Sequence, residues 1–414
     1  MKTYDVAVIG GGAAGTIAAI RAGQFDKKVA LVERNESIGK KILITGKGRC
    51  NVTNIAPVDT FIEKFGKQGQ FFRTAFFKFF NLDIIDFFAS KGLELKTERQ
   101  GRVFPVTDKA ESILAVLKQY LAENKVDMIY GARITEIKPR LGSFVLSMEG
   151  SDNITAKKIV LATGGASYKA TGSTGDGYNI ARSLGHAIIP LKPGLVPLTA
   201  KELWIKHLQG VALENIRITF EYGDKKKIVS EIGELMFTHF GVSGPLVLDL
   251  SGEIVSLLEE DKEIRLFIDL KPGLKFEQLE SKFLHKFKVK GNVQLKNLMK
   301  DILPQRLIPA FLNVLDLKWE IKTNQVTQEQ RRAIIQTLKA FPLTINGSLP
   351  LEEAMVTGGG VSTKEINPRT MESKIVPGLY FAGEIIDGAA SSGGYNLQQA
   401  FSTGYLAGES AANA

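Results

Sequence analysis

The sequence has 414 residues, of which 44% are hydrophobic and 23% charged, with a formal net charge of +9. These proportions exclude a largely disordered chain, and no apolar run approaches the length of a membrane-spanning helix. Because the chain enters its first predicted strand at once, we expect no leader sequence, no membrane partner and a cytoplasmic protein. A single cysteine excludes an internal disulfide and a CxxC redox pair.

The first predicted element is a short buried strand that leads through a glycine turn into a helix. Gly10 permits the tight turn, Gly12 lets backbone N–H groups approach a pyrophosphate, and Gly15 lets the helix lie close to the sheet. A second apolar run ends in Glu33, about 20 residues on, where a carboxylate accepts the hydroxyls of an adenosine ribose. Arg34 follows at once, but the geometry of a strand end directs Glu33 to the ribose. We therefore predict a site for an ADP-containing cofactor.

A basic loop broken by glycines follows over residues 39–54. Lys41, Lys47 and Arg49 could neutralise a pyrophosphate, and Gly46 and Gly48 permit close backbone approach to a flat ring. An ordinary surface loop is the alternative. Cys50 is either a reactive thiol beside the cofactor or a small buried residue.

The sequence pattern changes several times along the middle of the chain. Residues 57–126 are predicted to be helix-rich, with phenylalanines at near-helical spacing that we assign to a core. A buried strand at 159–163 ends in glycines, as a nucleotide-fold strand does where the backbone passes under a cofactor. From about 191, prolines mark a boundary, and alternating stretches followed by helical periodicity predict an antiparallel β-unit and then helices.

The last segment returns to the nucleotide-fold pattern. Glu384 and Asp387 follow a buried strand, where carboxylates can bond the hydroxyls of a sugar alcohol. A helix then opens after Gly394. On a flavin, the positive end of such a helix at the N1–C2=O edge would stabilise the negative charge of the reduced ring.

Several stretches together resemble the bacterial FAD-dependent flavoprotein family that includes aminoacetone oxidase and a bile-acid-reducing flavoprotein. These are residues 46–54, 101–105, 237–245, 357–361 and 378–396. More distantly, residues 162–165 and 174–177 are similar to fumarate-reductase-type flavoproteins. The resemblance implies an α/β protein with a glutathione-reductase-type, Rossmann-like FAD-binding domain. It also implies that this domain is discontinuous, over 1–190 and 346–414, with 191–345 as an inserted β-rich and helical domain.

The motifs and the resemblance together give a set of expected cofactor-binding residues. The set is Gly10, Gly12, Ala13, Ala14, Gly15, Glu33, Arg34, Lys41, Gly48, Arg49, Cys50, Asn51, Ile134, Ala162, Thr163, Gly164, Gly383, Glu384, Asp387, Gly394, Tyr395, Asn396 and Leu397. The resemblance implies that the last four lie under the pyrimidine end of the flavin and that Ile134 lies beside the adenine. Arg102, Tyr168 and His239 are candidates for the substrate pocket. We expect no metal site, and no side chain stands out as a general acid or base.

We expect an FAD-dependent oxidoreductase that passes a hydride or electron pair through flavin N5, in a cleft between the FAD domain and the insert. No second GxGxxG follows a strand, so NAD(P)H, the expected reductant of a small organic acceptor such as an enone, would bind transiently in the substrate's cleft. An oxygen-using amine oxidase, a tRNA-acting flavoprotein and a flavin-binding protein without turnover are the alternatives. The lysines are spread along the sequence, which favours a small-molecule substrate over nucleic acid; the oligomeric state is left open.

Overall fold

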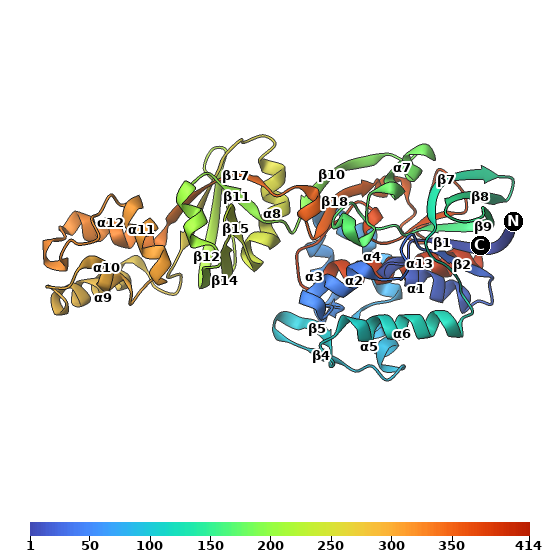
Figure 1. Cartoon of the computed structure of the whole chain (residues 1–414), viewed down its shortest axis with the longest axis horizontal. Coiled ribbons are helices and arrows are strands. Elements are labelled where there is room, and N and C mark those ends of the chain that lie inside the picture. Colours follow the sequence, from blue (N-terminus) through green and yellow to red (C-terminus); the bar gives the residue numbers. More distant parts are fainter. The chain divides into compact units, whose positions relative to one another are not determined.

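The computed structural model describes residues 1–414, and their contacts divide the chain into two compact units (Figure 1). The first unit comprises Met1–Gly194 and Leu351–Ala414, and the second comprises Leu195–Pro350. Each unit has its own hydrophobic core. The second unit extends beyond the expected residue 345, because β17 (Phe341–Ser348) pairs with β11 (Leu198–Ala200) and β16 (Ile264–Asp269).

A seven-stranded sheet forms the centre of the first unit. Its parallel strands are, in spatial order, β6 (Asp127–Ile129), β2 (Val29–Val32), β1 (Lys2–Ile9), β9 (Ile154–Leu161) and β19 (Leu379–Phe381). Antiparallel strands β8 (Ser143–Glu149) and β7 (Arg133–Arg140) continue the sheet beyond β9. All four residues of β2 are buried, as a parallel strand covered on both faces requires. Helix α1 (Ala13–Gly23) connects β1 to β2, so the α/β fold class predicted from the sequence is confirmed.

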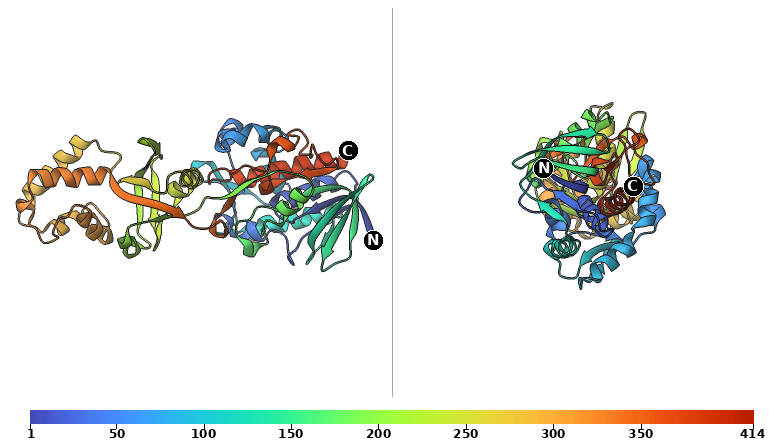
Figure 2. Two further views of the ribbon diagram at one scale, coloured as in Figure 1. Left: turned by 90° about the horizontal axis from the view of Figure 1, so that it is seen from above. Right: turned by 90° about the vertical axis from the view of Figure 1, so that its right-hand side faces the viewer.

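Helix α1 lies beside the last helix, α13 (Tyr395–Asn413), at backbone contact distance (Figures 1 and 2). A Cβ atom on Gly404 would lie 2.2 Å from the carbonyl oxygen of Ala14, and one on Gly408 would lie 2.3 Å from that of Ala18. Neither distance is compatible with a side chain. The two glycines therefore set how closely the helices approach, and thereby fix the position of the α1 N-terminus.

The other elements of the first unit surround this sheet. Its further helices are α2 (Lys40–Ile44), α3 (Val58–Lys64), α4 (Gly69–Lys78), α5 (Asn81–Ala89), α6 (Ala110–Glu123) and α7 (Asp176–Ser183). Its smaller sheets are β3 (Thr53–Asn54) with β5 (Arg102–Pro105) and β4 (Leu95–Thr97), and β10 (Ile188–Gly194) with β18 (Val356–Val361). Phe72, Phe76 and Phe88 are fully buried, as predicted for a phenylalanine core, whereas Phe77 of the same predicted cluster is exposed.

The second unit is built on a seven-stranded sheet in which every pairing is antiparallel. Besides β11, β16 and β17, the sheet contains β12 (Ala212–Tyr222), β13 (Lys226–Val229), β14 (Gly233–Phe237) and β15 (Gly241–Ser243). Its helices are α8 (Pro245–Leu257), α9 (Phe276–Val289), α10 (Leu295–Met299), α11 (Ile308–Val314) and α12 (Gln328–Lys339). Within this unit α9 to α12 gather together, apart from α8 (Figures 1 and 2). None of the helices in the chain combines the length and apolar character needed to cross a membrane.

A buried histidine joins the start of β10 to the segment 365–373. His186 Nε2 lies 2.9 Å from Ser373 Oγ, and Nδ1 lies 3.3 Å from a Glu365 carboxylate oxygen. The order serine, histidine, carboxylate is that of a hydrolase triad. However, Ser373 Oγ is buried and accepts hydrogen bonds from the backbone N–H groups of Ile375 and Val376, so we assign the cluster a structural role. Burial lowers the pKa of His186.

The contact between α1 and α13 predicts that replacing a glycine by alanine lowers the stability of the protein at Gly404 but not at Gly252, a helical glycine outside this contact. Gly404→Ala places a methyl group against the Ala14 carbonyl and should destabilise the protein by about 1–3 kcal/mol. Gly252→Ala, on α8 with no atom within 4 Å of its Cβ, should be neutral or stabilising by up to about 1 kcal/mol. Thermal unfolding measures both. A Gly404→Ala protein as stable as the wild type would contradict the packing described.

The buried His186 predicts a loss of stability in mild acid. The folded state keeps this imidazole neutral where the unfolded chain, with a pKa of about 6.5, takes up a proton, so the free energy of unfolding falls as the pH drops below about 6.5. Melting temperatures measured from neutral to mildly acidic pH should therefore fall less steeply for His186→Gln than for the wild type. His285→Gln, at an exposed position of α9, is the control and should keep the wild-type slope. Equal slopes for wild type and His186→Gln would exclude this role.

Candidate functional site

A cavity of about 1380 Å³, including space open to solvent, lies in the first unit along the carboxyl ends of the parallel strands. Residues directly after β1, β2, β9 and β19 line it, which is where open α/β sheets bind ligands. The cavity brings together fifteen of the residues expected to bind the cofactor. They are Gly10, Gly12, Ala13, Ala14, Glu33, Arg34, Lys41, Ile134, Ala162, Thr163, Gly164, Gly383, Glu384, Asn396 and Leu397.

Neighbouring protein atoms explain why glycine is needed at two positions of the turn, Gly10 and Gly15, but not at Gly12. Gly10 has φ +102°, and a Cβ there would lie 2.5 Å from the carbonyl oxygen of Ala162. A Cβ on Gly15 would lie 1.9 Å from the carbonyl oxygen of Gly10. A Cβ on Gly12 would meet nothing within 4 Å, although Gly12 lines the cavity. Since no protein atom requires a glycine at position 12, the free space there fits a bound group.

The N-terminus of α1 opens at the same place. Gly12 is its N-cap, no side chain caps the helix, and its first turn contains no acidic residue. The first N–H groups of a helix have no partner within it, and its dipole adds partial positive charge. The cavity therefore offers an anion a set of backbone donors next to the free space at Gly12.

Glu33 is a buried carboxylate in the cavity wall, with 7% of its surface exposed. One oxygen accepts the N–H of Gly11 at 2.7 Å, and the other accepts the backbone and side-chain N–H groups of Asn35 at 2.8 and 2.7 Å. These bonds orient the carboxylate, and ionised oxygens keep further lone pairs for hydroxyl donors. The arrangement suits a ribose diol.

The neighbouring Arg34 is engaged elsewhere. Its guanidinium donates to Thr174 Oγ1 at 2.6 Å and to Asp176 at 3.1 Å. Asp176 also accepts from Arg133 at 2.7 Å, and that hydrogen bond is the main reason why the pKa of Asp176 is lowered. Arg34 thus holds the loop before α7, while Glu33 is left to face a sugar.

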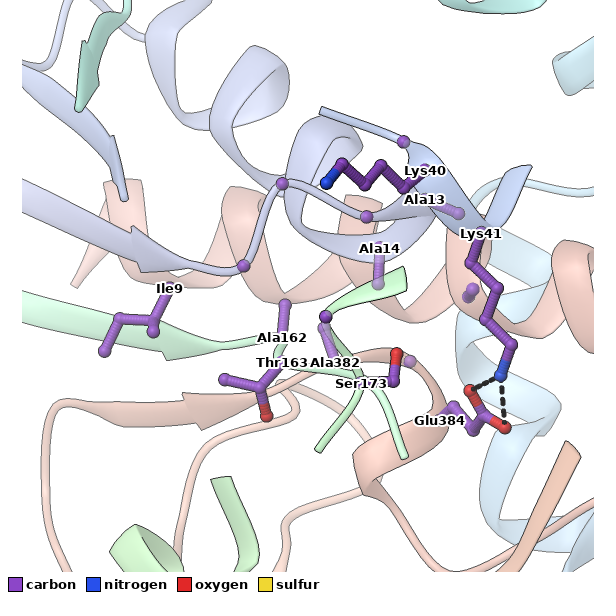
Figure 3. A pocket seen from close by; sticks show the side chains of 18 of the residues that line it. Ile9, Ala13, Ala14, Lys40, Lys41, Ala162, Thr163, Ser173, Ala382 and Glu384 are labelled. Carbon is purple, nitrogen blue, oxygen red and sulfur yellow. Dashed lines mark hydrogen bonds and ion pairs between the residues drawn. The ribbon is translucent and has the colours of Figure 1, made fainter. Parts of the chain in front are cut away.

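A second polar group of the cavity is an ion pair between Lys41 of α2 and Glu384, which follows β19 (Figure 3). Lys41 Nζ lies 2.7 and 3.0 Å from the two carboxylate oxygens and 2.8 Å from Ser167 Oγ. Glu384 also accepts the backbone N–H of Thr357 at 2.8 Å. The pair joins α2, β18 and the turn after β19 at one point of the cavity wall.

One hydroxyl in the cavity wall lacks a partner. Thr163 Oγ1 is buried and makes no hydrogen bond within the chain. This oxygen lies against Gly177 and is closed off from the open space, so it is not a contact for a ligand. The free space at Gly12, the uncapped α1 and the oriented Glu33 together fit a dinucleotide such as FAD.

Eight residues expected at the cofactor do not line the cavity, and local contacts explain most of them. They are Gly15, Gly48, Arg49, Cys50, Asn51, Asp387, Gly394 and Tyr395. Glu98 and Asp108 hold the Arg49 guanidinium at 2.8 and 3.2 Å. Asn51 accepts the N–H of Val103 at 3.2 Å. Cys50 is fully buried, and burial raises the pKa of its thiol to about 12, so the structure favours a small buried residue over a reactive thiol.

Three of these eight residues, Asp387, Gly394 and Tyr395, lie at the start of α13 or shortly before it. Asp387 is buried and accepts a hydrogen bond from Gln68, and burial raises the pKa of its carboxyl. A Cβ on Gly394 would lie 2.4 Å from the carbonyl oxygen of Thr53, so this glycine serves the packing of α13 on β3. Tyr395 packs edge-on against Phe61.

None of the three substrate candidates lines this cavity. Arg102 lies on β5 and donates to the carbonyl oxygen of Arg99 at 3.2 Å. Tyr168 is half-buried, which raises the pKa of its phenol. His239 lies in the second unit, exposed on the turn between β14 and β15.

The cavity also contains residues that the sequence reasoning did not select. They include Asn35, Thr45, Arg133, Ser173, Thr174, Met355, Thr357 and Gln399. Thr174 and Thr357 fall within the stretches 174–177 and 357–361 that carry the family resemblance, which did not single them out. The partnership of Asn35 with Glu33 could have been found from its position two residues after the acid.

Comparisons with known proteins agree with this geometry. The family model described as HI0933-like protein Rossmann domain matches residues 4–410. The chain is 35% identical over 409 residues to a 3-dehydro-bile acid delta(4,6)-reductase of Clostridium scindens, covering 98% of both chains. It is 32% identical over 417 residues to a ribosomal RNA dihydrouridine synthase of Escherichia coli, covering 98% of this chain and 97% of that one.

A solved structure shares the fold at low sequence identity. A flavocytochrome c3 fumarate reductase in its open conformation aligns with a TM-score of 0.54 and 17% identity, over 100% of this chain and 78% of that one. The cavity position, the glycine turn and the full-length family match lead to one conclusion. The chain belongs to the HI0933-like Rossmann-domain family and is an FAD-dependent oxidoreductase.

Proposed function

We propose that the protein reduces a carbon–carbon double bond conjugated to a carbonyl group, with NAD(P)H as the source of electrons. The names of both relatives support this reaction class. A delta(4,6)-reductase of a 3-dehydro bile acid saturates double bonds in conjugation with the 3-oxo group, and a dihydrouridine synthase saturates the uracil double bond next to a carbonyl. The substrates differ greatly, but the bond that is reduced has the same electronic character.

The observation that carries the proposal is the cavity whose wall contains Glu33, the uncapped α1 and the free space at Gly12. FAD, when bound, supplies two-electron transfer at N5 of its ring. The chain's own groups hold it: the α1 N-terminus and Gly12 bind the pyrophosphate, and Glu33 accepts the ribose hydroxyls. The cavity-lining residues of the expected set are the ones we propose as cofactor contacts.

Lys41 and Glu384 act as positioning residues in this proposal. Their ion pair fixes α2 against the turn after β19, and both side chains are about three-quarters buried, with 23% and 22% exposed. Breaking a largely buried ion pair of this kind is costly, because removing one partner leaves the other charge uncompensated. The shape of this part of the cavity therefore depends on both residues.

NAD(P)H is proposed as a transient reductant. The second unit has an entirely antiparallel sheet, so it provides no second parallel nucleotide-binding fold. A reductant would therefore reach the flavin from solvent, through the open side of the cavity. An oxygen-using amine oxidase remains the alternative for a flavin of this kind, and anaerobic absorbance spectra separate the two.

Gly12→Asp tests the cofactor site without disturbing the fold. The new carboxylate would occupy the free space at the α1 N-terminus and repel the pyrophosphate, which should weaken FAD binding at least about tenfold. The melting temperature of the apoprotein should stay close to the wild-type value, because no protein atom lies within 4 Å of that Cβ. Gly252→Asp, on α8 of the second unit, is the charge control and should keep its flavin. Wild-type flavin content in Gly12→Asp would refute the assignment.

An anaerobic spectrum of the purified protein tests the reaction class. NADH or NADPH should bleach the visible flavin absorption, and cyclohexenone, a simple conjugated enone, should restore it faster than air does. Cyclohexanone, which lacks the double bond, is the matched control and should leave the flavin bleached. Bleaching by aminoacetone with no response to either nicotinamide would contradict a reductase and favour an amine oxidase.

A further inference from the structure

The positive charge of the protein is concentrated in the helical part of the second unit. Residues 271–340 contain fourteen lysines and arginines but six aspartates and glutamates, a net charge of +8. Residues 195–270, which form most of the sheet of the same unit, contain eight basic and thirteen acidic residues, a net charge of −5. The lysines are spread along the chain as a whole, but within this unit the basic residues are concentrated in the helical part. Charge segregation of this kind marks a surface for a polyanion.

Helix α9 presents part of this charge as a continuous flank. Lys282 and Lys286 lie on α9, and Lys275 and Lys290 are its N-cap and C-cap. Their spacing of i, i+7, i+11 and i+15 places the four on one side of the helix and its ends. We call these four residues the lysine flank; it extends over about 22 Å. Glu280, the neighbouring acid on α9, lies on the other side and contacts Arg332 of α12 at 3.6 Å.

The ion pairs of the flank leave most of its charge uncompensated. Asp301 lies 2.7 Å from Lys290 and 3.5 Å from Lys286, so one carboxylate serves two lysines. Lys275 and Lys282 are exposed and make no ion pair in the structure. Four positive charges therefore face one negative charge, and the flank keeps a net charge of about +3 at neutral pH.

The chemistry favours a nucleic-acid strand over a membrane surface as the partner. Helices that bind membranes keep an apolar face free for lipid. In α9 that face is used, since Leu279, Phe283 and Phe287 are buried in the core of the second unit. What remains for a partner is a row of ammonium groups, which suits phosphates spaced along a strand.

We propose that the lysine flank binds the phosphate backbone of an RNA whose uracil is the substrate. This inference rests on the proposed function, because a uracil carries a double bond conjugated to a carbonyl, and a relative matched over the whole chain is named for forming dihydrouridine in ribosomal RNA. In the balanced reaction, the C5–C6 double bond of uracil takes up a hydride equivalent and a proton while one NAD(P)H is oxidised to NAD(P)⁺. The flank supplies sequence-independent affinity for the strand.

Binding of a fluorescently labelled oligouridine to the FAD-loaded full chain tests the proposal. Fluorescence anisotropy is measured between about 50 and 200 mM salt for the wild type and two variants. The flank variant is Lys275→Gln, Lys282→Gln, Lys286→Gln, Lys290→Gln. The control removes four lysines from the sheet region of the same unit: Lys225→Gln, Lys226→Gln, Lys227→Gln, Lys262→Gln.

The flank variant should bind at least about tenfold more weakly, and the slope of log affinity against log salt should fall by about 2 to 3, at about 0.7 per lost phosphate contact on a single strand. The control should resemble the wild type. Equal binding by the flank variant and the wild type, or an equal loss in the control, would overturn the proposal. So would flank-dependent binding to phosphatidylserine vesicles without binding to RNA.

The flavin content and the cyclohexenone response are recorded on the same preparations. A protein that reduces cyclohexenone but does not bind oligouridine through the flank would disprove the RNA surface and leave the reductase proposal intact. A protein that binds RNA through the flank but passes electrons to neither cyclohexenone nor uridine would support the binding surface and disprove the reductase.

Discussion

The structure depends on the position of helix α1, which backbone contacts fix on two sides. At its start, Gly15 lies against the carbonyl of Gly10, and along its length Gly404 and Gly408 of α13 lie against the carbonyls of Ala14 and Ala18. Contacts between backbones allow little adjustment, because no side chain can change its rotamer to relieve a shift. The N-terminus of α1 is therefore held at the carboxyl ends of the parallel strands, where its N–H groups and the free space at Gly12 meet the cavity.

The two units contribute different chemistry to this account. The first unit contains the parallel sheet, the cavity and the polar groups that fit FAD. The second unit contains an antiparallel sheet and a helical part with a net charge of +8 over residues 271–340. A cofactor that performs the same bond reduction on many substrates leaves recognition to the rest of the protein. In our proposal the second unit supplies that recognition through the lysine flank of α9.

The fold could be predicted from the sequence, and so could the positions of groups that local backbone geometry places in the cavity. The strand, turn and helix around Gly12 were predictable, because their spacing is set by local geometry, and Glu33 followed from its place at the end of β2. Side chains whose partners are distant in sequence were not predictable. Arg49 pairs with Glu98 and Asp108, and Lys41 pairs with Glu384, which lies more than 300 residues later.

Binding of FAD and FMN to the apoprotein, followed by flavin fluorescence, tests the central claim most directly. If the α1 N-terminus and Glu33 hold the pyrophosphate and the adenosine ribose, FAD should bind much more tightly than FMN, which lacks the adenosine. ADP should then compete with FAD. Equal affinities for FAD and FMN, with no competition by ADP, would contradict the account, because the ADP half of the cofactor would then contribute nothing to binding.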